Sequence, residues 1–376
     1  MLYWLKQFDM PLLKFEAIAD GSDVRCHILW QDGDKSSLLP LDLQLSDEGL
    51  AHWLCHRTIP KNRAFVHALL AKCGLSANRP LDIIDICKGL SLNDCYWVTQ
   101  DGFEGAFASH NFYENRFSQI LAQLAFTGFG SSIRSSLVSS PEFTTNGMLP
   151  KCWRRMDGDI FLYKGGTSGA GNSGMEPYSE YYASQIAQAM GIQAIPYGLS
   201  KWKGILCSTC KLFTSKQYAF LPAGRLIRRG GFEAVCQYCQ SLGKPYIDSL
   251  ADMVVFDAII CNTDRHFGNF GFLVDNQTNS ICAPAPLFDH GNSLFNFAYA
   301  DDWDDIDHLN KYIQTLQPCI YDDYIETARG MMGENHREMI RHLLDYRLRK
   351  HARYNLPDHR LKLISAAVRQ RARALL

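Results

Sequence analysis

The chain has 376 residues, with 38 Lys and Arg against 39 Asp and Glu, so its formal net charge is −1. Its composition, 47% hydrophobic and 20% charged, excludes a mainly disordered chain, and its length allows two or three domains. The near-neutral balance argues against a dedicated nucleic-acid-binding protein, and thirteen scattered cysteines favour reduced thiols over a disulfide framework.

The opening residues do not have the pattern of a signal peptide. Charges at Lys6, Asp9 and Lys14 interrupt any apolar core there. The most apolar internal run, residues 253–261, is interrupted by Asp257 and is far shorter than a membrane-spanning helix. We therefore expect a cytoplasmic protein with no membrane association.

Residues 1–130 are predicted to form an N-terminal α/β region, to which no pattern assigns a role. Alternating residues predict a strand at 24–30, and apolar residues at helical spacing predict a helix at 63–75. A second helix is expected at 117–126. The polar run 131–140 is typical of a linker.

From residue 141 the pattern changes to short strands and then to helices. A strand is predicted at 160–164, the glycine-rich segment 165–174 is expected to be mobile, and a helix follows at 177–190. Further strands are predicted at 192–199 and 217–221. The remaining predicted helices are 231–242, 246–261, 322–332, 337–352 and 358–375.

The segment 262–294 carries the residues that suit chemistry. Asp264 and Asn269 lie five apart in a polar loop after the helix 246–261. Predicted strands at 270–274 and 280–283 form a hairpin, which would return Asp289 to the neighbourhood of that loop. Two carboxylates and an amide would form a hard-oxygen site suited to Mg²⁺ that holds a nucleotide phosphate.

These residues resemble a known family. Residues 264–269 (Asp-Arg-His-Phe-Gly-Asn) and 288–291 (Phe-Asp-His-Gly) resemble the catalytic loop and metal-binding Asp of protein-kinase-like enzymes. Together with Asn262-Thr263 and the run Ala-Pro-Leu-Phe-Asp at 285–289, they are most similar to the HipA-like Ser/Thr kinases of bacteria. The loop also resembles that of phosphoinositide 3- and 4-kinases, so it does not fix the substrate.

The upstream half resembles the same family. Residues 144–151 (Thr-Thr-Asn-Gly-Met-Leu-Pro-Lys) are similar to its phosphate-covering loop, and Lys164 matches its nucleotide-binding lysine. Glu180 matches the glutamate that pairs with that lysine, and Glu176 is the weaker substitute. The chain departs from the family in having Pro150 and few glycines in the loop, and no acidic hinge residue after 217–221.

The resemblance, which covers about residues 141–376, implies an α+β, two-lobed protein-kinase-like fold. A small β-rich lobe (141–225) and a larger helical lobe (226–376) would follow the added N-terminal region. The implied activity is ATP- and Mg²⁺-dependent phosphorylation of a protein, with self-phosphorylation at Thr144 or Thr145. The family also implies a toxin–antitoxin role with an antitoxin partner, and a substrate such as an aminoacyl-tRNA synthetase or a translation factor.

The resemblance implies a role for each matching residue. Asp264 would orient the attacking hydroxyl and accept its proton, and Asn269 and Asp289 would hold Mg²⁺ on the phosphates. Lys164, paired with Glu180, would anchor ATP. Arg265 and His266 are expected to brace the loop. The residues implied to contact the nucleotide are Asn146, Gly147, Lys151, Lys164, Leu221, Ala223 and His266.

Two alternatives stay open for the function. The acceptor could be a lipid or a small molecule, as in the phosphoinositide kinases, or the fold could be that of an inactive binding protein. Retention of the residue types at 164, 264, 269 and 289 speaks against the inactive alternative.

Other motifs have simpler interpretations. Residues 169–174 match a dinucleotide-binding glycine motif, but the next predicted strand has no acidic residue, so we interpret them as a connector. Paired cysteines are typical of Zn²⁺ sites, but one pair falls in a predicted helix, and zinc stays open. These cysteines are Cys207, Cys210, Cys236 and Cys239. The basic C-terminal residues 337–376 are interpreted as a solvated helix face, and we expect no direct nucleic-acid binding.

Overall fold

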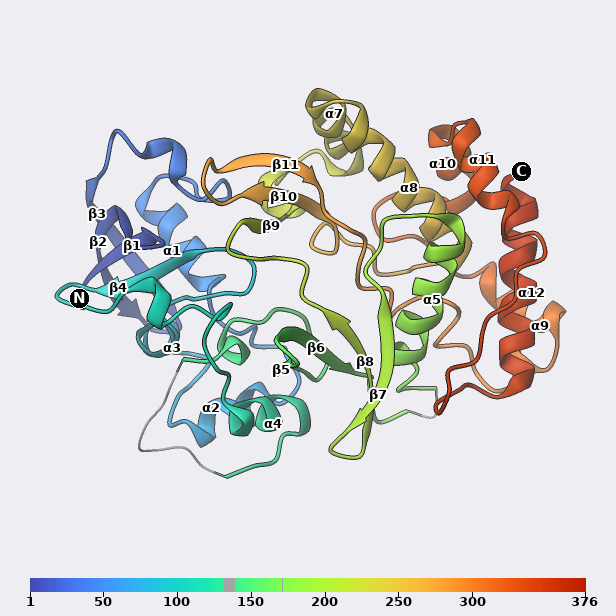
Figure 1. Ribbon diagram of the computed structural model, residues 1–376, viewed down its shortest axis with the longest axis horizontal. Coiled ribbons are helices and arrows are strands. Elements are labelled where there is room, and N and C mark those ends of the chain that lie inside the picture. The colour runs from blue at the N-terminus through green and yellow to red at the C-terminus, as the bar shows by residue number, and fades with distance from the viewer. Residues whose placement is uncertain (132–138, 171) are drawn as a thin grey trace. The chain divides into compact units, whose positions relative to one another are not determined.

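The computed structural model describes residues 1–131, 139–170 and 172–376 (Figure 1). Most of the predicted linker 131–140, and residue 171 of the glycine-rich segment, therefore lie outside the described residues. The chain divides into two compact units. Unit 1 comprises Met1–Lys164, Leu212–Leu221 and Leu273–Cys282; unit 2 comprises Gly165–Lys211, Pro222–Phe272 and Ala283–Leu376. None of the helices in the described stretches has the length and hydropathy of a bilayer-crossing segment.

Unit 1 opens with an antiparallel sheet in the strand order β3-β2-β1-β4. Its strands are β1 (Leu2–Gln7), β2 (Met10–Asp20), β3 (Asp23–Gln31) and β4 (Tyr96–Gln100). Successive residues of β1 alternate between the buried and the outer face, as the pleat of a strand requires. The strand predicted at 24–30 is confirmed as β3.

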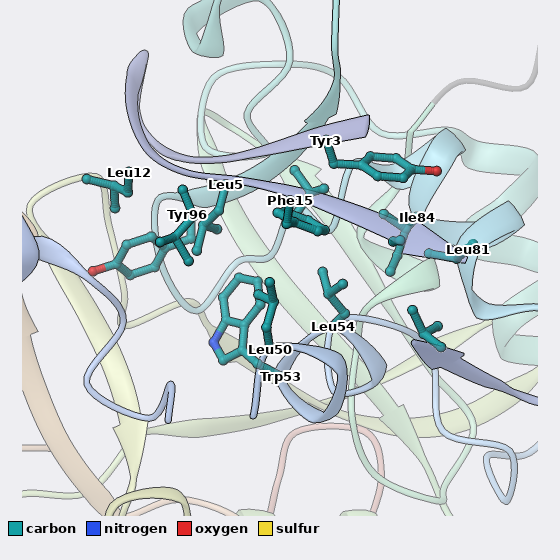
Figure 2. Close-up of a cluster of buried hydrophobic side chains, with 14 residues drawn as sticks. Tyr3, Leu5, Leu12, Phe15, Leu50, Trp53, Leu54, Leu81, Ile84 and Tyr96 are labelled. Carbon is teal, nitrogen blue, oxygen red and sulfur yellow. The ribbon is translucent and has the colours of Figure 1, made fainter. Parts of the chain in front are cut away.

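One face of this sheet is covered by helices α1 (Asp47–Cys55) and α3 (Pro80–Cys87). Figure 2 shows Leu50, Trp53 and Leu54 of α1 pointing toward the side chains of the sheet. The rings of Tyr3 and Phe15 stack with their centroids 5.7 Å apart. Burial of these apolar side chains fixes the sheet and its helices as one body.

Two more helices and a hairpin follow in unit 1. Helix α2 (Val66–Lys72) packs on α4 (Gln119–Thr127), and α4 packs on the hairpin of β5 (Lys151–Met156) and β6 (Asp159–Gly165). The helix predicted at 63–75 is too long, because Phe65 has a φ of +61° and helical geometry begins only after it. The helix predicted at 117–126 and the strand at 160–164 are confirmed.

A later hairpin completes the unit. Strands β9 (Tyr218–Pro222), β10 (Gly271–Asp275) and β11 (Ser280–Pro284) form a sheet in the order β11-β10-β9. The turn between β10 and β11 is bonded to the N-terminal region: Gln7 Nε2 donates to Asn276 O at 2.8 Å. Asn279 Nδ2 donates to the backbone oxygens of Ser37 and Leu39 at 2.8 and 2.7 Å.

In unit 2, helix α5 (Glu176–Met190) packs on the antiparallel hairpin of β7 (Tyr197–Trp202) and β8 (Ile205–Lys211). The strand predicted at 192–199 is wrong in its first half. Residues 192–196 form only an isolated parallel bridge, Ala194 to Leu287, within the described chain. Pro196 has no N–H to continue a ladder, so the regular strand starts after it.

The remainder of unit 2 is helical. Its helices are α6 (Ala223–Leu226), α7 (Gly231–Leu242), α8 (Lys244–Ile260), α9 (Ile306–Ile313), α10 (Tyr324–Met331), α11 (Glu334–Arg341) and α12 (Asp358–Leu375). The apolar part of α8 is buried against α7, α10 and α12 (Figure 1). The predictions at 231–242 and 358–375 are confirmed at both ends.

The helix predicted at 337–352 is wrong beyond Arg341. The chain after α11 instead lies along α5, where side chains satisfy its backbone. Gln185 Nε2 donates to Arg349 O at 3.0 Å and Gln185 Oε1 accepts from Arg349 N at 3.0 Å, while Tyr182 Oη donates to Asn355 Oδ1 at 3.1 Å. The two bonds from Gln185 thus satisfy the backbone of Arg349, where the predicted helix would have used helical hydrogen bonds.

Candidate functional site

The loop that follows α8 is folded by its own polar side chains. Cys261, with a φ of +49°, ends the helix. Asn262 Oδ1 accepts from the backbone N–H of Asp264 at 3.1 Å, and Asn269 Nδ2 donates to the backbone oxygen of Asp264 at 3.0 Å. Because Asn269 uses its nitrogen within the loop, its Oδ1 is the atom that suits a hard cation.

The segment that contains Asp289 lies against this loop. Asn292 Nδ2 donates to Asp264 Oδ2 at 3.1 Å, and Thr263 N donates to Asn292 O at 3.0 Å. Asp289 has a φ of +57°, an uncommon conformation for a residue with a side chain, and its N–H donates to Tyr197 Oη at 3.1 Å. The structure thus holds the Asp289 segment beside Asp264.

Arg265 joins these pieces from the interior of unit 2. Its side chain is 1% exposed and forms a two-point ion pair with Asp257 of α8, with N–O distances of 2.9 and 3.1 Å. It also donates to the backbone oxygens of Asn269 at 3.0 Å and Phe288 at 2.6 Å. Burial lowers the pKa of Arg265, but attraction to Asp257 outweighs burial and raises it above the ordinary value. Arg265 therefore braces the loop as a charged group.

His290 and Glu180 extend this buried network. His290 Nδ1 accepts from the Arg265 guanidinium at 3.0 Å, and because arginine only donates, the neutral ring carries its proton on Nε2. Glu180 of α5 is fully buried and accepts the backbone N–H of His290 at 2.8 Å. The predicted glutamate is thereby held one residue from Asp289.

The glycine-rich segment before α5 is a loop closed by Glu176. Glu176 Oε2 accepts the backbone N–H of Thr167 at 3.1 Å, and Thr167 Oγ1 accepts that of Gly174 at 3.2 Å. Asn172 Nδ2 donates to Phe297 O at 2.7 Å. Glu176 thus organises the connector.

Unit 1 contains the lysines of the predicted phosphate-binding elements. Lys151 begins β5, Lys164 lies near the end of β6, and the antiparallel register places them directly opposite each other. Each is 5% exposed. Side chains at opposed positions lie on the same face of a hairpin, so an anion with several oxygens, such as a phosphate, suits this pair.

The loop before β5 brings a glycine to one of these lysines. Gly147 has a φ of +91°, and a Cβ at this position would overlap Lys151 Nζ. Glycine therefore allows the ammonium group to lie against the loop backbone. The loop bends at residues 147–149, and Asn146 is exposed beside this bend.

The predicted self-phosphorylation residues are engaged within the same loop. Thr145 Oγ1 donates to Pro141 O at 2.6 Å and accepts from Trp153 Nε1 at 2.9 Å. Thr144 is 6% exposed, and its Oγ1 donates to Pro141 O at 3.3 Å. Either hydroxyl must leave this arrangement before it can attack a phosphate.

The remaining predicted nucleotide contacts lie as follows. Leu221 is buried in β9. The backbone N–H of Ala223 donates to Phe270 O at 3.0 Å, so it is already engaged. His266 Nδ1 accepts the backbone N–H of Gly268 at 3.0 Å, which braces the loop from its exposed side.

The paired cysteines lie on different kinds of element, one pair on β8 and the other on α7. Within residues 1–131, 139–170 and 172–376, no group of three or more His, Cys, Asp or Glu side chains is arranged to hold a metal ion. The described residues therefore offer no zinc cluster.

Asp257, Tyr197 and Asn292 are not identified by the motifs. In the sequence, Asp257 stands out only as a charge inside an apolar run. Because a carboxylate on a buried helix needs a partner, this position was a usable sign of a buried ion pair or hydrogen bond. Tyr197 and Asn292 belong to no pattern, and only the folded chain shows their contacts.

A lysine-bearing β-hairpin, a buried helix-borne glutamate and a braced Asp–Asn loop define the class: an α+β protein with a kinase-like fold, as predicted. No protein-family model matches the chain. Its sequence is 29% identical over 166 residues to the serine/threonine-protein kinase CtkA of Helicobacter pylori, a match that covers 39% of this chain and 50% of CtkA. The chain thus spans half the length of that relative.

Comparison with solved structures also supports a kinase-like fold. The chain matches the crystal structure of the H. pylori proinflammatory kinase CtkA with a TM-score of 0.50 and 19% identity, over 61% of this chain and 90% of that one. It matches HipA of Shewanella oneidensis MR-1, solved as a toxin–antitoxin complex with HipB and operator DNA, with a TM-score of 0.53 and 12% identity, over 99% and 96%. The chain has the fold of these two proteins, as the resemblance to HipA-like kinases predicts.

Proposed function

We propose that the protein is a HipA-like Ser/Thr kinase that transfers the γ-phosphate of ATP to a protein hydroxyl. The observation that carries this proposal is the braced loop of unit 2. Arg265 fixes the backbone at Asn269 and Phe288, so that the Asp264 carboxylate is held beside the Asp289 segment. Kinase catalysis depends mainly on such positioning and on charge neutralisation.

Asp264 is the proposed proton acceptor. The acceptor oxygen forms its bond to the γ-phosphorus while the bond from that phosphorus to the ADP oxygen breaks, and the hydroxyl proton passes to Asp264. The hydrogen bond from Asn292 to Asp264 Oδ2 fixes the orientation of the carboxylate before the acceptor binds.

The donor set fits Mg²⁺, because Asn269 Oδ1 and the Asp289 carboxylate are hard oxygen ligands. A bound Mg²⁺ would neutralise the negative charge of the phosphates. Lys151 and Lys164 are proposed to bind phosphate oxygens, and Glu180 keeps the backbone after Asp289 in place through His290 N.

The direct test is incubation with labelled ATP and Mg²⁺. We expect Asp264→Asn to lower the rate by about 10²–10⁴-fold, the usual contribution of a general base. The matched control is Asp248→Asn, which removes an exposed carboxylate of α8 that pairs with Lys244, and it should retain full activity. No label on any acceptor, or equal labelling by Asp264→Asn, would contradict the proposal.

The same assay identifies the acceptor class. Label on protein supports the proposal, whereas label found only in lipid or metabolite fractions by thin-layer analysis would favour the phosphoinositide-kinase alternative. We also propose self-phosphorylation at Thr144 or Thr145. Mass spectrometry of protein incubated with ATP should locate the phosphate in residues 144–151, and its absence there would refute that part.

By analogy with the HipA–HipB complex, we propose a toxin role in the bacterial cytoplasm and an antitoxin-type partner. The proposed substrate is a protein that belongs to the translation machinery. Induced expression should arrest growth with the wild type and not with Asp264→Asn. Equal growth with both forms would argue against the toxin role and leave the kinase assay unaffected.

A further inference from the structure

Arg63 lies in the N-terminal region, immediately before α2, and its side chain is 2% exposed. Its guanidinium donates to the backbone oxygens of Glu142 and Thr145, both at 3.1 Å, and to that of Lys151 at 2.5 Å. These acceptors lie at the two ends of the candidate phosphate loop. A residue about eighty positions earlier in the chain thus joins the entry and the exit of that loop.

The next residues contact the middle of the loop. The backbone N–H of Ala64 donates to Met148 O at 2.7 Å. Phe65 then adopts a φ of +61°, a conformation that is costly for a bulky side chain. Strained backbone persists only where surrounding contacts determine it, and such positions are concentrated at functional sites. The corner formed by residues 63–65 therefore holds the loop at its start, middle and end.

Burying a charged arginine at this corner costs more free energy than a purely structural contact requires. Arg63 is buried among neutral carbonyl oxygens, and burial lowers its pKa to about 10, an effect that the nearby Glu142 opposes. Glu142 is itself fully buried and accepts the backbone N–H of Trp153 at 3.0 Å. Apolar side chains usually stabilise a buried turn at least as well as a buried charge does.

We propose that Arg63 is a positioning residue for nucleotide binding, which sets the loop so that Gly147 and Lys151 meet the phosphates. The inference rests on the proposed function and gives the N-terminal region a part in it. Because Gly147 packs against Lys151 Nζ, a shift of the loop ends also moves the ammonium group. Arg63 acts through the loop and does not touch the substrate.

The test compares two buried arginines of unit 1. Arg63→Lys keeps the charge but loses the fork that reaches several carbonyls. Arg57→Lys is the matched control: Arg57 is 4% exposed and donates to Gly89 O at 2.8 Å and Tyr96 O at 2.9 Å, away from the loop. We expect Arg63→Lys to raise the KM for ATP by about tenfold with little change in kcat, since phosphate binding is lost in ground and transition states alike. Arg57→Lys should change neither.

The outcomes separate the two proposals. If the wild type neither binds nor uses Mg-ATP, the proposed function and this inference are both wrong. If the wild type binds ATP and Arg63→Lys binds it equally well, or if Arg57→Lys raises KM by the same factor, only the inference is wrong.

A second measurement uses only the wild-type protein, so its result does not depend on whether a variant folds. In the wild type, a non-hydrolysable ATP analogue with Mg²⁺ should slow amide hydrogen exchange in residues 145–149 and at Ala64 together, because the loop and the corner are one bonded unit. Slower exchange in the loop with no change at Ala64 would overturn the inference.

Discussion

Replacing Arg265 with Met should destabilise the protein strongly, because it leaves Asp257 as a buried carboxylate without its cation. Asp257 is fully buried, and both of its oxygens accept from Arg265. Removing one partner of a buried pair typically costs about 3–5 kcal/mol. Total folding stability is about 5–15 kcal/mol, so the variant should lose a large fraction of it.

The buried carboxylate also determines whether the stability of the variant rises or falls with pH. Burial already raises the pKa of Asp257, and Arg265 opposes that shift. Without Arg265 the pKa of Asp257 in the folded state rises further, so the folded chain binds a proton that the unfolded chain releases. Stability of Arg265→Met should therefore fall as pH rises from 5 to 8, relative to the wild type.

The assay is thermal and urea unfolding followed by circular dichroism, with the double variant Arg265→Met, Asp257→Leu as the comparator. Replacing the whole pair by apolar groups should recover most of the lost stability. Activity should not recover, because the oxygens of Asn269 and Phe288 have lost their donor. A loss below about 1 kcal/mol for the single variant, or equal losses at pH 5 and pH 8, would refute the reasoning.

Two further predictions use exposed groups. A thiol reagent should modify Cys282 and Cys319 first, because both are exposed, whereas burial raises the pKa of Cys87 to about 12; rapid labelling of Cys87 without denaturant would contradict this. Asp47→Asn should lower the raised pKa of His27, which comes mainly from a hydrogen bond to Asp47, in an NMR titration. The stabilisation by this pair is present below the ordinary pKa of histidine and is lost as pH rises through the raised value, so an unchanged pKa in Asp47→Asn would refute it.

The local sequence was enough to predict most of the helical part of unit 2. Residues 231–242 and 358–375 carry their own periodicity and end signals, and the structure keeps their boundaries. Prediction from the local sequence failed where side chains distant in the sequence replace local hydrogen bonds. Gln185 satisfies the backbone at Arg349, so a segment with helical periodicity is not a helix.

The candidate site also contains residues that the sequence predicts and residues that only the structure reveals. The residues expected to do chemistry, such as Asp264 and Asn269, stand in a short motif and can be read from the sequence. The residues that hold them belong to other elements. Asp257 and Arg63 make their contacts through burial and through the geometry of a guanidinium group, and no spacing in the sequence encodes that geometry.

The bonds from Gln7 to Asn276 and from Asn279 to Ser37 and Leu39 have a consequence for synthesis. Unit 1 cannot close until the hairpin up to Cys282 has left the ribosome, although its first part ends at Lys164. At about 5–20 residues per second, the intervening stretch of roughly 120 residues takes about 6–24 s to make. During that interval the buried amide of Gln7 lacks its final partner, so the nascent chain should be most open to chaperones and proteases before translation passes the hairpin.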